Sequence, residues 1–338
     1  MSQYISRPVF VTGGSGYIGR NVLRSLADGG RSVRALARSE ASAAVVAGLR
    51  AEPVSGDLSD LDALRTGMAG CEAVIHAAAD TDHGAATAAQ EHANLQGTRN
   101  VYAAARDVGV HRALHLSTEA VLLTGQPLRN ADERTPMASP PAGGYSKTKG
   151  KAERIALEAS GADLEVVVLR PRFVWGRDDT TALPQLVEAA RTGKLAWIDG
   201  GHYAMSTTHI ANVAHGITLA LERGRPGEVY FISDGEPVEF RDFVTKLLAT
   251  QGVAPPSREI PRWLVVPVVW LGDALGRITG GALHGPMSWQ EYAVLGVEVT
   301  LNIDKARREL GYAPVISREE GLAELTPGGA TREDGSPR

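Results

Sequence analysis

The sequence predicts a doubly wound α/β fold, in which a parallel sheet is covered by helices on both faces. Short continuous apolar runs alternate with segments of helical spacing through the first half of the chain, and the first run leads directly into a glycine-rich turn. The length is a further indication. A chain of 338 residues, 43% of them hydrophobic and 22% charged, can bury a large core and divide into two lobes.

The strands and helices are expected in a fixed order along the chain. A short buried strand at Val9–Val11 is followed by the glycine-rich TGGSGYIG and by a helix in RNVLRSLADGG, which has helical apolar spacing and ends in glycines. Further strands are expected in SVRALAR, AEPVSGD, AVIHAAA, ALHLST and LEVVVLRP, with a helix in NLQGTRNVYAAARDVG. Strands that are so continuously apolar are typical of a sheet buried on both faces.

The turn after the first strand has glycines at every third position, Gly13, Gly16 and Gly19. Glycines in this place let the backbone approach a pyrophosphate, which would sit at the amino end of the helix that begins near Tyr17. A tight turn without a ligand is the alternative. The turn lies between the first strand and the first helix, and a second strand begins within about twenty residues, so a dinucleotide cofactor is favoured.

The end of the second expected strand indicates which dinucleotide binds. An acidic residue there would bind the ribose of NAD, whereas an arginine would accommodate the 2′-phosphate of NADP. The sequence has Ala37 followed by Arg38. NADP(H) is therefore the expected cofactor, with NAD(H) as the alternative, because Glu40 is close by and Arg38 could be an ordinary surface arginine.

Tyr145 and Lys149 are four residues apart at the start of an expected helix, so they lie on one face of it. Hydride transfer to a ketone leaves negative charge on oxygen, and a tyrosine can deliver the neutralising proton. A free tyrosine has a pKa of about 10, and a nearby ammonium would lower that pKa by stabilising the phenolate. Lys149 is expected to do this and to hold the nicotinamide ribose. A helix-surface pair is the alternative interpretation.

Seven motifs together resemble the extended short-chain dehydrogenase/reductases over about residues 8 to 325. They are TGGSGYIG, GDLSD, HAAA, NLQGTRN, HLSTEAV, YSKTK and LRPRFVWG, in the family's order. Within that superfamily the chain looks most like the 3β-hydroxysteroid dehydrogenase and dihydroflavonol reductase branch. The resemblance implies a Rossmann domain at 1–172 and about 206–233, and a smaller substrate lobe at 173–205 and 234–325.

The resemblance also implies a role for individual residues. Asp57 would bind the adenine amino group with Leu58 beside the ring, and Pro171 and Val174 would lie near the nicotinamide amide. The implied cofactor site comprises Gly13, Ser15, Gly16, Tyr17, Ile18, Arg38, Asp57, Leu58, Ala77, Ala78, Ala79, Tyr145, Lys149, Pro171 and Val174. The implied catalytic residues are Thr118, Tyr145 and Lys149, and no metal is expected.

The hydroxyl of this catalytic set departs from the family pattern, which usually has serine. The chain has Ser117-Thr118, and alignment of TEAV with the family motif favours Thr118, with Ser117 as second choice. Thr118 would orient the substrate carbonyl and stabilise the developing oxyanion. The next residue, Glu119, is expected to be a turn residue near the pocket, and Asn94 is expected either to cap its helix or to join a proton relay.

An apolar small molecule is the expected substrate, of a steroid, polyketide or β-keto acid type. All five tryptophans follow Lys149, which suggests an apolar pocket, although they could equally form the core of the second lobe. A sugar-nucleotide epimerase or dehydratase using NAD is the main alternative, but the segment GGHYAMSTTHI lacks the arginine such an enzyme would use. A regulatory protein that senses NADP without turnover is disfavoured, because it would not need a proton donor.

The remaining features indicate an ordinary cytoplasmic protein with a formal net charge of −4. Cys71 is the single cysteine, so an intramolecular disulfide is excluded and a reducing compartment is expected. The amino-terminal MSQYISRPVF lacks the apolar core of a signal peptide, and WLVVPVVWLG is too short to span a bilayer. Nucleic-acid binding is not expected, homodimerisation is common in the superfamily, and residues 326–338 are expected to be a disordered tail.

Overall fold

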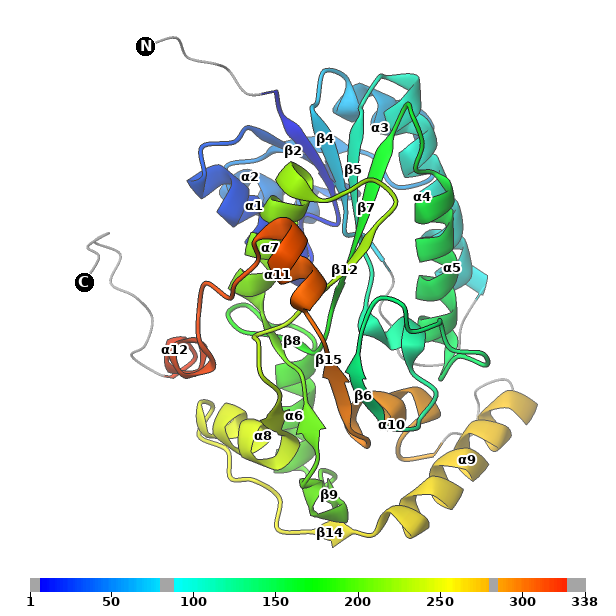
Figure 1. Cartoon of the computed structure of the whole chain (residues 1–338), viewed down its shortest axis with the longest axis vertical. Helices are drawn as coiled ribbons and strands as arrows, with labels where there is room; N and C mark the ends of the chain where they lie inside the picture. Colours follow the sequence, from blue (N-terminus) through cyan, green and yellow to red (C-terminus); the bar gives the residue numbers. More distant parts are fainter. Residues whose placement is uncertain (1–6, 80–87, 280–284, 327–338) are drawn as a thin grey trace.

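A seven-stranded parallel sheet forms the centre of the computed structural model, which describes residues 7–79, 88–279 and 285–326 (Figure 1). Its strands are β1 (Val9–Thr12), β2 (Val33–Ala37), β3 (Glu52–Ser55), β4 (Ala73–His76), β5 (Arg112–Leu116), β7 (Glu165–Pro171) and β12 (Val229–Ile232). They lie in the order β12-β7-β5-β4-β1-β2-β3, and all neighbours are parallel. The predicted fold class is confirmed. The strand order reverses between β1 and β4, where such folds bind ligands at the carboxyl ends of the strands.

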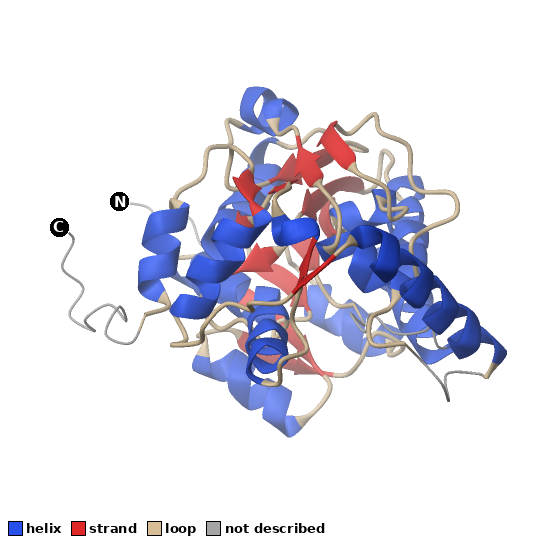
Figure 2. Cartoon of the chain, turned by 90° about the horizontal axis from the view of Figure 1, so that it is seen from below, coloured by secondary structure: helices blue, strands red, loops and turns tan. Residues whose placement is uncertain are grey.

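Helices cover both faces of this sheet, as Figure 2 shows from below. One face carries α1 (Tyr17–Asp28), α2 (Glu40–Gly48), α7 (Ile210–Arg223) and α11 (Asp304–Leu310), and the other carries α3 (Leu61–Met68), α4 (Ala88–Asp107) and α5 (Gly144–Glu158). The central strand β1 serves both cores, because alternate side chains of a strand point to opposite faces. Val9 and Val11 pack on the first face and Phe10 on the second, and all three are fully buried.

A second, mixed sheet lies beyond the carboxyl ends of the first. Its strands, in spatial order, are β13 (Val238–Glu239), β10 (Ala204–Met205), β15 (Val299–Leu301) and β6 (Leu128–Ala131). Two further parallel pairs are β8 (Val174–Trp175) with β11 (Thr208–His209), and β9 (Trp197–Ile198) with β14 (Glu259–Ile260). The remaining helices are α6 (Ala182–Arg191), α8 (Phe240–Ala249), α9 (Arg262–Ile278), α10 (Trp289–Leu295) and α12 (Arg318–Glu324), with 3₁₀ turns η1 (Glu119–Leu122) and η2 (Asp199–Gly201).

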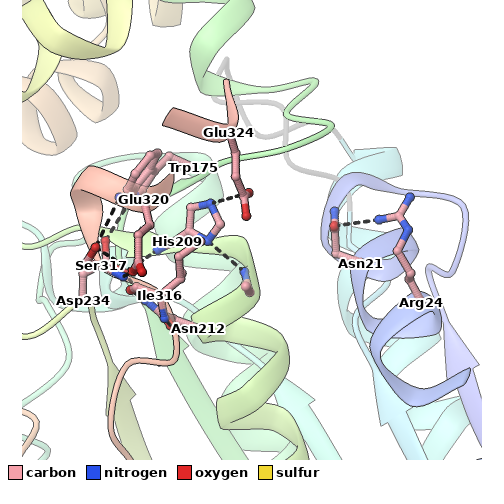
Figure 3. Close-up of polar contacts among 11 residues, drawn as sticks. Asn21, Arg24, Trp175, His209, Asn212, Asp234, Ile316, Ser317, Glu320 and Glu324 are labelled. Atoms are coloured by element: carbon pink, nitrogen blue, oxygen red, sulfur yellow. Dashed lines mark hydrogen bonds and ion pairs between the residues drawn. The ribbon is translucent and has the colours of Figure 1, made fainter. Parts of the chain in front are cut away.

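Asp234 and Asn212 fasten the carboxyl-terminal segment to α7 (Figure 3). The carboxylate of Asp234 accepts hydrogen bonds from the indole of Trp175 at 2.8 Å, the backbone N–H of His209 at 2.6 Å and the amide of Asn212 at 2.8 Å. Asn212 in turn accepts from the backbone N–H of Val315 at 2.7 Å. These bonds hold β8, the start of α7 and the approach to α12 in one rigid unit.

His209 lies at the centre of the same group and faces Glu324 of α12, with 3.7 Å between Nε2 and Oε2 (Figure 3). Burial lowers the pKa of His209 to about 4, while Asp234 acts in the opposite direction. The imidazole is therefore neutral near pH 7, and its contact with Glu324 is not an ion pair there.

The structure excludes one of the two roles expected for Asn94 and leaves the predicted disordered tail untested. α4 begins at Ala88, so Asn94 lies within the helix and does not cap it; its amide donates to the hydroxyl of Thr148 at 3.2 Å. The predicted disordered tail lies outside the described residues from 327 onward. No helix in the described ranges combines the length and the apolar character needed to cross a membrane.

Candidate active site

A single cavity of about 1310 Å³ runs along the carboxyl ends of the central strands. All but one of the residues predicted for the cofactor and catalytic sites line it. They are Gly13, Ser15, Gly16, Tyr17, Ile18, Arg38, Asp57, Leu58, Ala77, Ala78, Ala79, Thr118, Tyr145, Pro171 and Val174. Lys149 is the exception: it is buried and is not part of the lining. Segments separated by up to 161 residues along the chain, from Gly13 to Val174, thus meet around one space.

The glycine turn is shaped by close backbone contacts that a side chain would prevent. Gly13 has φ +78°, and a Cβ there would lie 2.7 Å from the backbone nitrogen of Ala78. A Cβ on Gly19 would lie 2.0 Å from the carbonyl oxygen of Gly13. The turn therefore packs directly on β4 and on the first turn of α1. No side chain caps α1 at Gly16, so its first N–H groups fit an anionic group in the cavity.

A buried chain of hydrogen bonds supports this turn from beneath, and sequence reasoning missed it. Thr12 and His76 are joined at 2.7 Å, and His76 and Thr98 at 3.0 Å. Thr98 donates its proton to the carbonyl of Asn94, so it must accept from His76 Nε2, and His76 Nδ1 then accepts from Thr12. Burial lowers the pKa of His76 to about 3, with a smaller contribution from Lys149, and this keeps His76 neutral.

Asp57 and Arg38 lie together at the end of the cavity formed by β2 and β3. Asp57 accepts hydrogen bonds from the backbone and hydroxyl of Ser59, at 2.7 and 2.5 Å, and these lower its pKa, with a smaller contribution from Arg38. Arg38 is exposed and makes no hydrogen bond or ion pair with any residue in the described part of the chain. Its guanidinium is therefore available to an anionic ligand.

Tyr145 lies opposite a chain of buried polar groups that begins at Thr118. The Thr118 hydroxyl donates to Glu119 Oε2 at 2.8 Å and accepts from the backbone N–H of Ala120 at 3.2 Å. Glu119 Oε1 pairs with Arg172 at 2.9 Å, and the two side chains are only 4% and 1% exposed. Glu119 is thus a buried ion-pair partner and more than the simple turn residue that was expected. The Thr118 hydroxyl has one proton, so it can donate to a substrate oxygen only when its hydrogen bond to Glu119 is broken.

The pKa of Tyr145 is raised, whereas Lys149 was expected to lower it. Burial raises the pKa of Tyr145 above its usual value and Glu119 adds to that effect, whereas a hydrogen bond with Thr118 lowers it. Lys149 is not among the groups that shift the pKa of Tyr145. Its ammonium donates to the carbonyl of Leu116 at 2.7 Å. In this structure Tyr145 therefore keeps its proton near neutral pH.

Lys149 sits in a buried setting of its own. Burial lowers its pKa to about 8, against the opposing effect of Glu153. Glu153 is fully buried, pairs with Arg170 at 2.5 Å and accepts from the hydroxyl of Ser117 at 2.5 Å. The hydroxyl proton of Ser117 is thus directed to Glu153, which leaves Thr118 as the hydroxyl beside Tyr145.

The far end of the cavity is mainly apolar. Its walls there include Phe173, Leu186, Leu195, Met287, Val294 and Leu295, from the strand-end after β7, from α6 and its loop, and from α10. Among the described residues that line the cavity, Arg38 is the one arginine and Lys194 the one lysine. No arginine pair therefore faces the apolar end. The α6 wall was not predicted. Amphipathic spacing marks residues 182–191 as a helix, but not as one that packs over a site.

The tryptophans do not explain this apolar character, which corrects the suggestion drawn from their clustering. None of the five lines the cavity. Trp175 and Trp197 are fully buried in the core around α8, and Trp289 packs against Tyr292. Trp263 and Trp270 are exposed on α9.

Comparison with known proteins identifies the relatives of this chain. The model of the 3-beta hydroxysteroid dehydrogenase/isomerase family matches residues 10–262. The 4-hydroxy-2-methyl-3-oxo-4-farnesyl-3,4-dihydroquinoline-1-oxide ketoreductase of Stigmatella aurantiaca is 48% identical over 97% of this chain and 98% of its own. The 2-alkyl-3-oxoalkanoate reductase of Stenotrophomonas maltophilia is 34% identical over 94% and 98%.

A solved structure shows the cofactor class of the fold. DesIV of Streptomyces venezuelae, a dTDP-glucose 4,6-dehydratase with NAD bound, superposes with a TM-score of 0.72, at 26% identity over 94% of this chain and 95% of its own. A nicotinamide cofactor is thus supported for the present fold, and the residues around the glycine turn fit one.

Proposed function

The chain belongs to the 3-beta hydroxysteroid dehydrogenase/isomerase family of the extended short-chain dehydrogenase/reductases, and from this premise we propose that it is an NADP(H)-preferring ketoreductase acting on an apolar small molecule. One observation carries the proposal. The cavity runs from the glycine turn and Arg38, past Thr118 and Tyr145, to an end walled mainly by apolar side chains. Successive parts of the cavity thus fit a cofactor, a reacting carbonyl and the apolar body of a substrate.

When bound, the nicotinamide supplies or accepts a hydride. Tyr145 delivers the proton to the carbonyl oxygen in the reducing direction. Burial and the charge of Glu119 keep the pKa of Tyr145 high, so the phenol is present as the acid at neutral pH. Thr118 positions the oxygen, and its release from Glu119 supplies a second hydrogen bond to the developing charge.

Lys149 is assigned to the cofactor. Its pKa of about 8 leaves its ammonium mostly charged at pH 7, so it can donate a hydrogen bond to a hydroxyl of the nicotinamide ribose. Arg38 binds the 2′-phosphate and Asp57 the adenine amino group. Ala77, Ala78 and Ala79 leave room for the cofactor above β4, because larger side chains would project into the cavity.

A substrate panel tests the proposed function. NADPH should be oxidised with at least one apolar ketone, and KM should fall by about fourfold for each methylene added to an alkyl chain, since each buried methylene contributes about 0.8 kcal/mol. The panel should contain long-chain β-keto acids, steroid ketones and UDP-glucose, followed by nicotinamide absorbance and calorimetry. Micromolar binding of UDP-glucose, with no heat from any apolar ketone, would refute the proposal.

Replacing Arg38 by aspartate should move cofactor preference from NADPH to NADH. The variant loses a charge-assisted contact to the 2′-phosphate and gains a carboxylate suited to the ribose hydroxyls. We expect the ratio of kcat/KM for NADPH over NADH to fall by roughly tenfold or more. Arg154→Asp, an exposed change on α5 outside the cavity lining, is the matched control. A native enzyme that already binds NADH ten times more tightly than NADPH would contradict the assignment.

A further inference from the structure

Glu119 is a buried carboxylate in the part of the cavity where we place the reaction. Among the described residues that line the cavity, three carry a carboxylate: Asp57, Glu119 and Glu291. Asp57 lies at the end formed by β2 and β3, and Glu291 accepts from the backbone and the hydroxyl of Ser288 at the start of α10, at 2.7 and 2.9 Å. Glu119 remains, and neither the cofactor contacts nor the proton transfer proposed above uses it.

Arg172 holds Glu119 in place on the side away from the catalytic hydroxyl. One guanidinium nitrogen of Arg172 donates to Glu119 Oε1 at 2.9 Å, and the other two donate to the carbonyls of Val299 and Val294 at 3.2 and 2.9 Å. Both charged side chains are buried. Oε1 is therefore occupied by a partner that is itself fixed to β15 and α10, and Oε2 is the oxygen that faces Thr118.

The hydroxyl of Thr118 supplies the hydrogen bond to Oε2. Its one proton goes to that oxygen at 2.8 Å, and the backbone N–H of Ala120 donates to the hydroxyl at 3.2 Å. A ketone offers only acceptors, so a plain ketone that takes the Thr118 proton also takes from Oε2 the donor that it has in this structure. The loss of a partner is costly for a buried polar group, and more costly for a charged one. A plain ketone is thus a poor match to this site.

A hydroxyl on the carbon next to the reacting carbonyl removes the conflict. The two oxygens of such a hydroxyketone are on neighbouring carbons and can lie side by side, as Thr118 Oγ1 and Glu119 Oε2 do at 2.8 Å. The carbonyl oxygen accepts from Thr118, and the substrate hydroxyl donates to Oε2 in its place. We propose that Glu119 is a specificity-determining residue that accepts this hydrogen bond, and that the preferred substrate is an apolar ketone with a hydroxyl on the adjacent carbon.

This inference rests on the proposed function and defines its substrate more closely. NADPH remains the two-electron reductant, so the carbonyl carbon gains a hydride and the carbonyl oxygen gains the proton of Tyr145. The adjacent hydroxyl keeps its own proton, and the product is a vicinal diol. The apolar walls at the far end of the cavity, among them Leu186 and Leu295, suit the rest of the molecule.

Three matched substrates test the proposal on the wild type: butyroin, which is an apolar hydroxyketone, its O-methyl ether, and the octanone that lacks the hydroxyl. The ether keeps the electron-withdrawing oxygen beside the carbonyl but cannot donate, and the octanone cannot donate and adds no bulk. With NADPH, kcat/KM for butyroin should exceed both other values by roughly tenfold or more, because each of them lacks a hydrogen bond to a charged group.

The outcomes separate this inference from the proposed function. An octanone or an ether that is reduced as efficiently as butyroin overturns the role of Glu119 and leaves the ketoreductase intact. If no apolar ketone oxidises NADPH, including these three, the proposed function fails and the inference fails with it.

Glu119→Gln tests the residue itself. Arg172 has only donors, so it keeps the amide oxygen on its own side and turns the amide nitrogen toward Thr118 and the cavity. The position that accepted a proton then donates one, and the Thr118 hydroxyl becomes free to donate to a carbonyl. The variant should reduce the octanone better than the wild type does and butyroin less well. The ratio of kcat/KM for butyroin over the octanone should fall by roughly tenfold or more.

Glu133→Gln is the matched control, because Glu133 is also partly buried, accepts from the backbone N–H of Phe231 at 2.9 Å and lies outside the cavity lining. It should keep the wild-type ratio. A Glu119→Gln variant that keeps its unfolding midpoint and loses equally on both substrates would overturn the proposal. If this variant does not fold, the three substrates on the wild type still decide.

Discussion

Tyr145→Phe should lose roughly 10²-fold or more in turnover while it still binds NADPH. The change removes the hydroxyl that hydrogen bonds with Thr118 and that we propose delivers a proton to the substrate oxygen. It leaves untouched the glycine turn, Asp57 and Arg38, which line the opposite end of the cavity. Turnover is measured by nicotinamide absorbance and NADPH binding by fluorescence titration.

Tyr312→Phe is the matched control for that experiment. Its hydroxyl is also buried, donates to the carbonyl of Ser233 at 2.9 Å, and lies outside the cavity lining. The control should lose some stability and keep its turnover. Full activity in Tyr145→Phe, or an equal loss of turnover in both variants, would contradict the proposed role of Tyr145.

Glu153→Ala should lower the free energy of unfolding by about 3–5 kcal/mol, because it leaves Arg170 charged and unpaired in the core. Arg170 and Glu153 are 4% and 0% exposed, and two guanidinium nitrogens of Arg170 donate to the carboxylate at 2.5 and 2.9 Å. Glu153 also accepts from Ser117, so the change loosens β5, α5 and β7 together. Denaturant unfolding followed by circular dichroism measures the loss.

Asp242→Ala provides the comparison on the surface. Asp242 pairs with Lys246 at 2.7 Å on α8, and both side chains are about half exposed. Solvent screens this pair, so its loss should cost below about 1 kcal/mol. Replacing both members of the buried pair, with Glu153→Leu and Arg170→Met, should recover part of the stability. If Glu153→Ala costs no more than Asp242→Ala, the buried pair does not stabilise the fold in the way argued.

Features encoded by neighbouring residues could be predicted from the sequence. The strand at β1, the glycine turn and α1 follow one another directly, so their spacing alone indicates how they pack. Asp57, Ala78, Thr118 and Tyr145, which belong to the seven motifs, line one cavity. Each lies at or just after the carboxyl end of a parallel strand, or on the helix that faces it, and parallel strands bring those ends to one edge of the sheet.

Features that depend on distant residues could not be predicted in this way. Glu119 and Arg172 are 53 residues apart, and nothing local to either indicates that they form a buried pair. The spacing of Tyr145 and Lys149 correctly indicated one helix face, but the pKa of Tyr145 depends on burial and on Glu119. Likewise, the number of tryptophans gave no information on which of them face solvent.

The most direct test of the whole account is to follow the hydride itself. NADPH deuterated at C4 of the nicotinamide should be oxidised in proportion to alcohol formed, and one deuterium should appear on the carbinol carbon of an apolar product, as hydride transfer from the cofactor requires. Mass spectrometry of the product decides the matter. Deuterium that stays on the cofactor while a sugar nucleotide is isomerised or dehydrated, or tight NADPH binding with no deuterium in any product, would contradict a ketoreductase.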